Sequence, residues 1–522
     1  MKILLIYPPC LERRIHTEDV SVPPIGLYYV GATLAEAGHA VEIISLHDWD
    51  GDPAEIRRLI IDKRPRIIGL SILNANRWGG IDVARIAKSV NPEVAVAFGG
   101  PSATLLSDHF LKNFPEIDYI VFGEGERSFL ALVNHLAEGT AGPPASVPGI
   151  AWRDGGTIKK TMPEHKIDDL DALPNPARYF TYSHVVLTRG CPEACAFCGS
   201  PALWGRRVRS HSPGYFVDQM ALLADRGVSF FHVSDDVFTL RPDRTVAVCR
   251  EIIDRGLRIT WAAISRVDRV DPEMLGWMRR AGCVQISFGV ESGSPRIRKL
   301  LNKRIRDADI KRAFSLTQQY GILARAYFIY GCPGETDETI DETLALISEI
   351  RPLAAIFYLL SLFPGTALYE GIRKGTGLSD EIWRERIEDL LYCQLDPALP
   401  DERVREFGRR LRTGFHQRLG GFVESLELAD DPAFYPYHAD FLSRLALTFS
   451  HGDYAGIPAV GDTDAIAERL HRRALTYAPD HRAFVGLGML QQKRGDEQAA
   501  REIIAEGLEC FPDSAELRAM AR

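Results

Sequence analysis

The sequence predicts an α/β protein that ends in helices, and three observations lead to this fold class. Short β-branched apolar runs alternate with segments of helical spacing over residues 1–140, a second alternating series fills residues 181–372, and helical periodicity alone remains over residues 373–522. Continuous apolar strands between helices are typical of parallel sheets buried on both faces. We therefore expect a flavodoxin-like domain, a partial (β/α)6 TIM-type barrel and an α-helical C-terminal region.

Length and composition limit the kind of protein. The chain of 522 residues and 58.2 kDa is too long for one ordinary domain, and 46% hydrophobic with 25% charged residues is typical of a globular protein. A mean hydropathy of −0.10, without a long apolar run, argues against a membrane protein. The net charge of −8 gives no global electrostatic basis for binding nucleic acid. Nine cysteines, scattered except for one cluster, favour a reducing, cytoplasmic compartment over a disulfide framework.

The first region, residues 1–140, is expected to form five strand–helix units. The predicted strands are Ile3–Tyr7, Ala40–Leu46, Arg66–Ile72, Val94–Gly99 and Asp118–Phe122, and the predicted helices are Leu27–Ala37, Pro53–Lys63, Asp82–Val90 and Leu105–Asn113. Ligands of such sheets bind beyond the carboxyl ends of the strands, where glycine lets a ligand approach the backbone. Four turns lie there, either as a binding rim or as ordinary βα turns: Tyr7–Pro9, Asn74–Gly80, Gly99–Ser102 and Gly123–Glu126.

A stretch rich in proline and glycine separates the two α/β series. Residues 141–180 contain Gly142-Pro143-Pro144 and Pro174-Asn175-Pro176, which break both periodicities and indicate a linker. The barrel over residues 181–372 is predicted from six strands: Val185–Leu187, Phe230–Val233, Ile259–Ala263, Val284–Phe288, Ala324–Ile329 and Ile356–Leu360.

The C-terminal region, residues 373–522, contains one internal repeat. The segment that begins at Arg473 recurs from Glu506, an offset of 33 residues, with Gly495-Asp496 between the two copies. Helix, turn and helix at this period resemble the tetratricopeptide pattern, over about residues 464–515. One repeat is too short for a solenoid, so we expect these helices to cap the barrel, with docking of a protein partner as the alternative.

Three cysteines cluster directly after the first barrel strand. Cys191, Cys195 and Cys198 follow one another with three and two residues between them, at the end of the barrel where such folds place their chemistry. Three thiolates would leave one iron of a [4Fe–4S] cluster open for a substrate or cofactor. The alternatives are a zinc site with His211 as fourth ligand, or three thiols without a metal. The spacing and the location favour the cluster.

The same loop, Cys191-x3-Cys195-x-Phe197-Cys198, resembles the signature of the radical SAM superfamily. Motifs resembling those of this family continue through the barrel at His232–Asp236, Ser265–Asp268, Phe288–Ser294, Ile329–Glu335 and Phe363–Glu370. The resemblance implies a site for S-adenosyl-L-methionine (SAM) made by Phe197, Asp235, Asp236, Arg266, Glu291, Ser292, Gly331 and Pro333. Each motif alone has a structural alternative: Asp235-Asp236 could cap a helix and Glu291 could pair with an arginine.

The first region resembles the B12-binding domain of cobalamin-dependent radical SAM enzymes, through Pro23–Leu27, Ala37–His39, Gly99–Pro101 and Gly123–Glu126. The Asp-x-His-x-x-Gly loop, whose histidine ligates cobalt in other B12 proteins, does not occur in the sequence. The resemblance implies that Asn74–Gly80 meets the lower face of cobalamin instead, and many relatives carry histidine where this chain has Ser102. The implied cobalamin contacts are Pro9, Asn74, Trp78, Gly99, Gly100, Ser102, Gly123 and Glu124.

These resemblances imply an enzyme that reductively cleaves SAM at a [4Fe–4S] cluster held by Cys191, Cys195 and Cys198 and methylates an unactivated carbon, or phosphorus, of a small molecule. Radical rearrangement or oxidative cyclisation with the same cofactors is the alternative, and a non-enzymatic cobalamin-binding or docking protein is a more remote one. We expect an electron donor such as flavodoxin or ferredoxin as a partner, and neither nucleic acid nor membrane. The sequence assigns no catalytic residue and no substrate.

Overall fold

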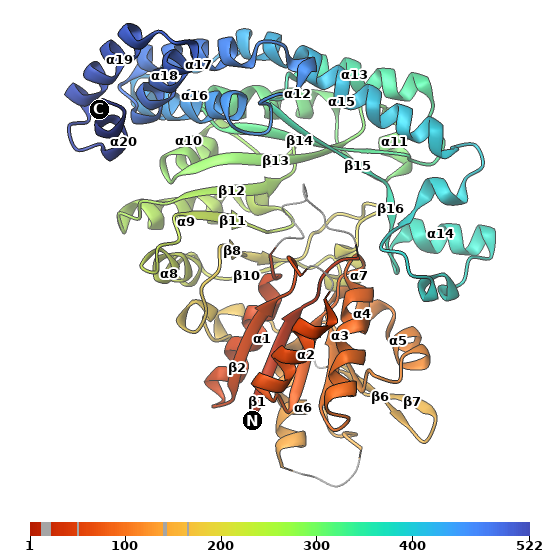
Figure 1. The fold of residues 1–522 in the computed structure, drawn as a ribbon. Helices are drawn as coiled ribbons and strands as arrows, with labels where there is room; N and C mark the ends of the chain where they lie inside the picture. The colour runs from red at the N-terminus through yellow and green to blue at the C-terminus, as the bar shows by residue number, and fades with distance from the viewer. Residues whose placement is uncertain (12–21, 50–51, 139–142, 164–165, 522) are drawn as a thin grey trace. The chain divides into compact units, whose positions relative to one another are not determined.

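The computed structural model describes residues 1–11, 22–49, 52–138, 143–163 and 166–521 (Figure 1). The chain forms two compact units, of which the first contains Met1–Asp236 and Ser361–Tyr392 and the second contains Val237–Leu360 and Cys393–Arg522. The boundary that we expect between residues 140 and 141 lies outside the described residues. Among the helices of the described ranges, none combines the length and the apolar character needed to cross a membrane.

A seven-stranded sheet forms the core of the first unit. Its strand order is β2-β1-β3-β4-β5-β6-β7, and the first five of these pair in parallel. The strands are β1 (Lys2–Tyr7), β2 (Ala40–Ser45), β3 (Ile67–Ser71), β4 (Ala95–Gly99), β5 (Tyr119–Val121), β6 (Ile150–Asp154) and β7 (Thr157–Lys160). The order 2-1-3-4-5 is that of flavodoxin, so the predicted flavodoxin-like fold is confirmed.

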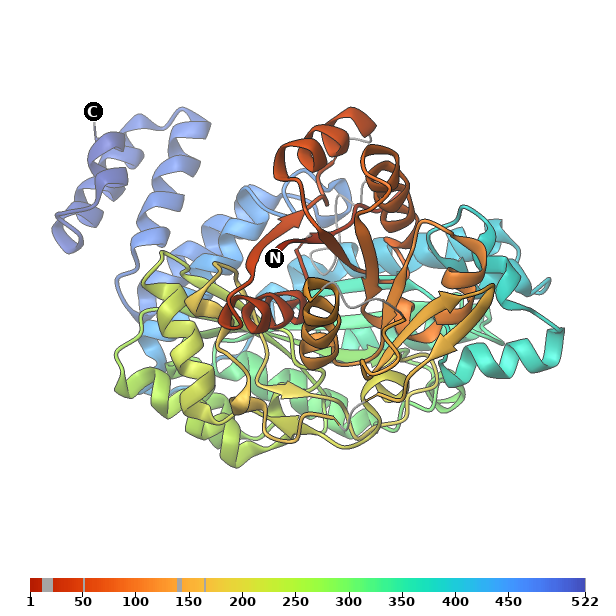
Figure 2. The ribbon, with the colours of Figure 1, turned by 90° about the horizontal axis from the view of Figure 1, so that it is seen from below.

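Helices cover both faces of this sheet (Figure 2). They are α1 (Ile25–Glu36), α2 (Pro53–Lys63), α3 (Arg77–Val90), α4 (Pro101–Leu105), α5 (Ser107–Asn113) and α6 (Gly125–Ala137). On one face, Leu27 and Leu34 of α1 and Leu132 of α6 form one cluster with Ile3 and Leu5 of β1. Every residue of β1 from the second onward is buried, which explains why this strand is apolar throughout instead of alternating.

The structure differs from the sequence expectation at two places in this unit. The expected linker contains the hairpin β6–β7, which extends the sheet in antiparallel fashion because Ile150, Ala151 and Trp152 bury their side chains against it. The expected loop Asn74–Gly80 is mostly helix, since α3 begins at Arg77. Gly79 allows this early start: a Cβ there would lie 2.0 Å from the carbonyl oxygen of Pro9.

Six strands form the second sheet, in the order β15-β14-β13-β12-β11-β8. They are β8 (His184–Val185), β11 (Phe230–Val233), β12 (Thr260–Ser265), β13 (Cys283–Glu291), β14 (Leu323–Tyr330) and β15 (Ala354–Leu359). β8 and β11 pair in parallel within the first unit, and the other four pair in parallel within the second. This sequential parallel order confirms the predicted partial barrel.

The helices of this region follow the strands in the alternation that the sequence predicts. They are α7 (Ser200–Trp204), α8 (Pro213–Ala224), α9 (Pro242–Asp254), α10 (Pro272–Arg280), α11 (Pro295–Leu300), α12 (Asp307–Gln319), α13 (Asp337–Ile350) and α14 (Ala367–Thr376). Along the chain, helix α14 comes after the short strand β16 (Ser361–Leu362) and before β17 (Leu390–Leu391), and these two strands pair with each other in antiparallel fashion.

Helices alone make up the C-terminal part of the second unit, as expected. They are α15 (Asp401–Glu424), α16 (Tyr435–Ser450), α17 (Thr463–Tyr477), α18 (His481–Arg494), α19 (Glu497–Cys510) and α20 (Ala515–Met520). A side chain at the N-cap of each of the last four accepts a hydrogen bond from the backbone: Asp462, Asp480, Asp496 and Ser514. Helices α17 and α18 pack so closely that a Cβ on Gly486 would lie 2.2 Å from Nε2 of the buried His471.

Candidate active site

The three clustered cysteines lie on a loop between a short strand pair and a helix of the first unit. Strand β9 (Thr188–Arg189) leads into the loop and pairs with β10 (Arg209–Ser210), and α7 follows it. Gly190 makes the entry turn with φ of +103°, and a Cβ there would lie 2.9 Å from the carbonyl oxygen of Arg207. Within the loop, the amide of Cys198 donates to the carbonyl of Cys195 over 3.2 Å.

The thiols of this loop influence one another, and none of them forms a disulfide. The pKa of the Cys198 thiol is raised to about 11, mainly by burial and also by Asp236, Cys195 and Cys191, although a backbone hydrogen bond with Ser200 lowers it. Because the thiolate is the form that binds metal, such a thiol needs a strong positive charge beside it, and the irons of a cluster provide one. In the described ranges, no three His, Cys, Asp or Glu side chains converge to hold a single ion. Three cysteine thiolates can bind three of the four irons of a [4Fe–4S] cluster, so the donor set of the loop fits such a cluster.

The zinc alternative required His211 beside the cysteines, and the structure gives this histidine other partners. His211 is fully buried, its Nε2 lies 2.9 Å from the hydroxyl of Tyr29, and its Nδ1 lies 3.0 Å from a carboxylate oxygen of Asp171. Burial lowers the pKa of His211 to about 4, against the raising effect of the Asp171 hydrogen bond. Both ring nitrogens are therefore engaged away from the thiols.

Two adjacent carboxylates, Asp235 and Asp236, hold the ends of the cysteine loop. Asp235 is buried and accepts from the backbone amide of Leu187 over 2.7 Å and from the hydroxyl of Thr188 over 2.6 Å. Asp236 accepts from the hydroxyl of Ser200 over 2.9 Å and from the backbone of Gly190. Burial is the main reason why the pKa of Asp235 is raised to about 7, although its hydrogen bonds with Leu187 and Thr188 lower it. Both side chains therefore shape the loop before and after the cysteines, and their predicted contact with SAM stays a prediction.

A pocket of about 300 Å³ lies beside this loop in the first unit. Predicted residues of the glycine-rich turns line it: Gly99, Gly100, Gly123 and Glu124. The lining also includes Val186, Thr188 and Arg189 from the segment that enters the cysteine loop, and Ser234 and Asp236 after β11. A Cβ on Gly26 or Gly123, both in the lining, would meet no atom within 4 Å. Apolar walls with open space over glycine backbone fit a large planar cofactor such as the corrin ring of cobalamin.

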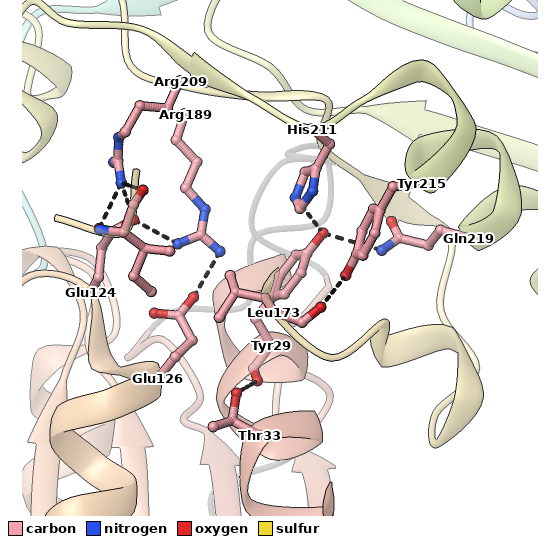
Figure 3. A network of polar contacts seen from close by, with 11 residues as sticks. Tyr29, Thr33, Glu124, Glu126, Leu173, Arg189, Arg209, His211, Tyr215 and Gln219 are labelled. Atoms are coloured by element: carbon pink, nitrogen blue, oxygen red, sulfur yellow. Dashed lines mark hydrogen bonds and ion pairs between the residues drawn. The ribbon is translucent and has the colours of Figure 1, made fainter. Parts of the chain in front are cut away.

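One wall of the pocket is a buried network of charged side chains (Figure 3). Arg189 donates to Glu124 and to Glu126, both over 2.7 Å, and Arg209 donates to both carboxylate oxygens of Glu124 over 2.9 and 2.7 Å. Burial alone would raise the pKa of Glu124, but the two arginines outweigh it and hold this pKa below its usual range. The side chain of Glu124, predicted to contact cobalamin, is thus occupied by arginines.

The remaining predicted cobalamin residues lie outside the lining of this pocket. The side chain of Asn74 donates to the carbonyl of Glu388, and the indole of Trp78 donates to the carbonyl of Glu385 over 2.7 Å. Between them the buried Arg77 donates to the carbonyls of Asn74, Ile387 and Glu388, so the segment before β17 covers this turn. Ser102 lies buried in α4, and Pro9 packs against Gly79. Their contact with cobalamin stays a prediction.

The other predicted SAM residues belong to the second unit, apart from Phe197, which lies half-buried in the cysteine loop. Glu291 ends β13 with φ of +67°, and its carboxylate accepts from the ammonium group of Lys303 over 2.7 Å, with both side chains buried. Gly289 makes room for this pair, because a Cβ there would lie 2.5 Å from the Glu291 carboxylate. Arg266 is buried and donates to Asp268 over 3.0 Å.

The remaining SAM residues of this unit lie in two turns after strands. The hydroxyl of Ser292 lies 3.3 Å from that of Thr343 and accepts from the amide of Ser294. Gly331, with φ of +75°, precedes Pro333 in the turn after β14, where the buried carboxyl of Glu335 accepts from the Gly331 amide. Burial raises the pKa of Glu335 to about 7.

The sequence analysis did not predict the hydrogen bonds that four buried side chains make in the site. These side chains are Arg189, Arg209, Lys303 and Glu335. Arg189 and Glu124 are 65 residues apart, and no local pattern joins them. A weak signal existed for Arg189, since it directly precedes the Gly-Cys step of the loop.

Comparison with known proteins gives two family matches along the chain. Residues 185–347 match the Radical SAM superfamily, and residues 16–133 match the B12 binding domain. An uncharacterized methyltransferase from Pyrococcus horikoshii is 29% identical over 80% of this chain and 93% of its own length. The anaerobic magnesium-protoporphyrin IX monomethyl ester cyclase of Rubrivivax gelatinosus is 28% identical over 71% of this chain and 70% of its own length.

The fold resembles that of a solved radical S-adenosylmethionine methyltransferase, TsrM from Kitasatospora setae, determined with cobalamin and a [4Fe–4S] cluster bound. The TM-score is 0.65 at 17% identity, with 91% of this chain and 99% of that chain covered.

Proposed function

Because the chain belongs to the cobalamin-dependent radical SAM enzymes, with a B12-binding domain ahead of a radical SAM domain, we propose that it methylates a small molecule. Its cofactors are cobalamin, a [4Fe–4S] cluster and SAM. The acceptor in this proposal is an unactivated carbon, or a phosphorus. One pocket, lined both by the glycine turns of the B12-matching segment and by the strand that enters the cysteine loop, supports the pairing of the cofactors. The observation that favours methyl transfer is the relative from Pyrococcus horikoshii, similar over 80% of this chain and named a methyltransferase.

The chain's own residues bind and orient these groups. When bound, the cluster supplies an electron for the cleavage of SAM, and cobalamin carries a methyl group. In the proposal, Cys191, Cys195 and Cys198 hold the cluster, and Asp235 and Asp236 set the shape of their loop through Leu187, Thr188, Gly190 and Ser200. The SAM site is assigned, as the resemblance implies, to Phe197, Asp235, Asp236, Arg266, Glu291, Ser292, Gly331 and Pro333.

The pocket supplies the surroundings that radical chemistry needs. Its walls are mainly apolar, with side chains such as Leu5, Val30, Leu73, Phe98 and Phe129. Such walls exclude water from a bound cofactor. Cobalamin is assigned to this pocket, over the backbone of Gly99, Gly100, Gly123 and Glu124.

Oxidative cyclisation is a second candidate, and one finding favours it. The relative from Rubrivivax gelatinosus, similar over 71% of this chain, is named a cyclase, whereas the relative from Pyrococcus horikoshii is named a methyltransferase. Cyclisation would use the same cluster and the same SAM residues, so both candidates share one site and differ in the fate of the substrate radical.

Product analysis separates these functions. The full chain is reconstituted without oxygen with iron, sulfide and cobalamin, and is then incubated with SAM and dithionite, which stands in for a donor such as flavodoxin or ferredoxin. Formation of both 5′-deoxyadenosine and S-adenosylhomocysteine supports the methyltransferase, because a methylase consumes one SAM for the radical and one for the methyl group. 5′-Deoxyadenosine alone points to cyclisation or rearrangement, or to the absence of the substrate from the mixture, and counts against methyl transfer.

Two cysteine variants, one inside the loop and one outside it, provide a test with a matched control. Cys195→Ala should lose the visible absorption of the cluster and all cleavage of SAM, whereas Cys510→Ala, at an exposed cysteine outside the loop, should keep both. Cleavage of SAM by Cys195→Ala would contradict the assignment of the three cysteines.

A further inference from the structure

Arg189 connects the strand that enters the cysteine loop with the turn that starts α6, two parts of the first unit that are far apart in the sequence. It is the last residue of β9, two residues before Cys191, and its side chain is 7% exposed. Its Nη1 donates to Glu124 and its Nη2 to Glu126, both over 2.7 Å. A guanidinium group that spans two carboxylates fixes both direction and distance, which a single ammonium group does not. The strand entering the cysteine loop is therefore tied to the turn that starts α6.

A second arginine completes the network from the neighbouring strand. Arg209 lies opposite Arg189 in the β9–β10 pair, and its Nη1 donates to both oxygens of Glu124 and to the carbonyl of Ile167. The amide of Ile167 in turn donates to Glu124 over 2.9 Å. Two cations and two anions face one another, so the network is balanced in charge. We call Glu124, Glu126, Arg189 and Arg209 the Arg189 network.

Helix α1 holds the same strand pair from another direction. The hydroxyl of Tyr29 lies 2.9 Å from Nε2 of His211, just after β10, and accepts from the side chain of Gln219 over 3.2 Å (Figure 3). The guanidinium carbon of Arg189 lies 5.0 Å from the centre of the Tyr29 ring. Two elements of the B12-matching segment, α1 and the turn before α6, thus contact the strands that flank the cysteine loop.

Stability alone is a weak reason for such a network. Burying four charged side chains costs desolvation energy, and well-packed apolar residues in the same places are often as stable. An ion network fixes the register between two elements, which apolar packing does not do. The Arg189 network also forms part of the pocket wall, since Glu124, Glu126 and Arg189 all line the pocket.

We propose that Arg189 is a positioning residue, which fixes the cysteine loop against the pocket wall through Glu124 and Glu126. The proposal rests on the proposed function, in which the loop holds the cluster and the pocket holds cobalamin. In this role the arginine touches neither the substrate nor the reacting atoms. It sets the separation of the two cofactors, a quantity to which reactions between bound groups are sensitive.

The test measures that separation in the full chain loaded with cluster and cobalamin. When the reduced cluster and Co(II) cobalamin are both paramagnetic, the cluster speeds the relaxation of the cobalt signal in electron paramagnetic resonance, and this effect falls steeply with distance. Wild type is compared with Arg189→Lys, Arg189→Met and Glu126→Gln. Iron content, bound corrinoid and melting temperature are measured for each variant. Arg207→Met is the control, because the side chain of Arg207 is exposed and pairs with the exposed Asp168.

The expected result is that Arg189→Met and Glu126→Gln bind iron and corrinoid as wild type does but lose part of the relaxation effect. Arg189→Lys should retain more of it than Arg189→Met, and Arg207→Met should retain all of it. If Arg189→Met does not fold, Glu126→Gln decides, because glutamine has the size of glutamate but lacks the charge that attracts the Arg189 guanidinium group.

Two outcomes would overturn the proposal, and they are distinguishable. If the folded variants load both cofactors and keep the full relaxation effect, the network is structural only, while the proposed function stands. If wild type itself takes up no corrinoid or assembles no cluster, the proposed function fails and the positioning role fails with it.

Discussion

Replacing Asp235 by asparagine tests how the buried carboxyl holds the strand before the cysteine loop. Its pKa is raised from 3.8 to about 7 by burial, a difference of roughly 3 units, and each unit corresponds to about 1.4 kcal/mol. The native state therefore holds the proton more tightly than the unfolded state does. The contribution to stability is fully present below pH 3.8 and is lost as the pH rises through about 7, to a total of about 4 kcal/mol. Asparagine cannot ionise, yet its oxygen can still accept from the amide of Leu187.

The free energy of unfolding in urea, measured from pH 4.5 to 8, gives the answer. Relative to wild type, Asp235→Asn should become progressively more stable as the pH rises, whereas Asp225→Asn, at an exposed position, should run parallel to wild type. Hydrogen exchange of the peptide around Leu187 locates the effect, since its amide donates to Asp235. A constant difference between Asp235→Asn and wild type over the whole range would refute the reasoning, because the carboxyl would then not titrate within it.

Three further substitutions probe the loop, the covered turn and the C-terminal helices. Gly190→Ala should bind much less iron, because alanine disfavours a φ of +103° and its Cβ would lie 2.9 Å from a carbonyl oxygen. Gly199→Ala in the same loop adds a Cβ with no atom within 4 Å, so this variant should bind iron as wild type does in the same assay. Arg77→Met should lose about 2–4 kcal/mol of stability, because one buried and two partly buried carbonyls lose their donor, and limited proteolysis should cut the segment before β17 sooner. Gly486→Ala should lower the melting temperature by clashing with the histidine that it faces, whereas Gly421→Ala on α15, with open space around it, should raise it; equal shifts would contradict the packing described.

Local patterns predicted the two parallel sheets, because each of their strands carries its own apolar run between helix signals. The antiparallel hairpin β6–β7 escaped prediction for the same reason. Only Ile150–Trp152 of its first strand is buried and its second strand is largely exposed, so neither shows a long apolar run, and the glycines around it suggest a linker.

In the candidate site, too, local features could be predicted and contacts between distant residues could not. The spacing of the three cysteines and the glycine turns are local, so the sequence was sufficient to place them. The partners of Glu124 and Asp235 are not local: they lie 65 and 48 residues away, and only the fold brings them together. The loop Asn74–Gly80 was expected to face a ligand, but the segment that covers it comes from more than 300 residues later, for which no sequence pattern exists.

The hydrogen bonds of Asp235 and Asp236 have a consequence for the order of events during synthesis. The three cysteines leave the ribosome together, but the carboxylates that shape their loop follow 36 to 48 residues behind the groups that they bind. Until β11 has been made and has docked beside β8, the thiols belong to a loop without a defined shape. Metal loading should therefore come after folding of this unit, in contrast to small zinc domains whose metal drives their folding. Iron that reaches the chain too early would meet three unorganised thiols instead of a finished site.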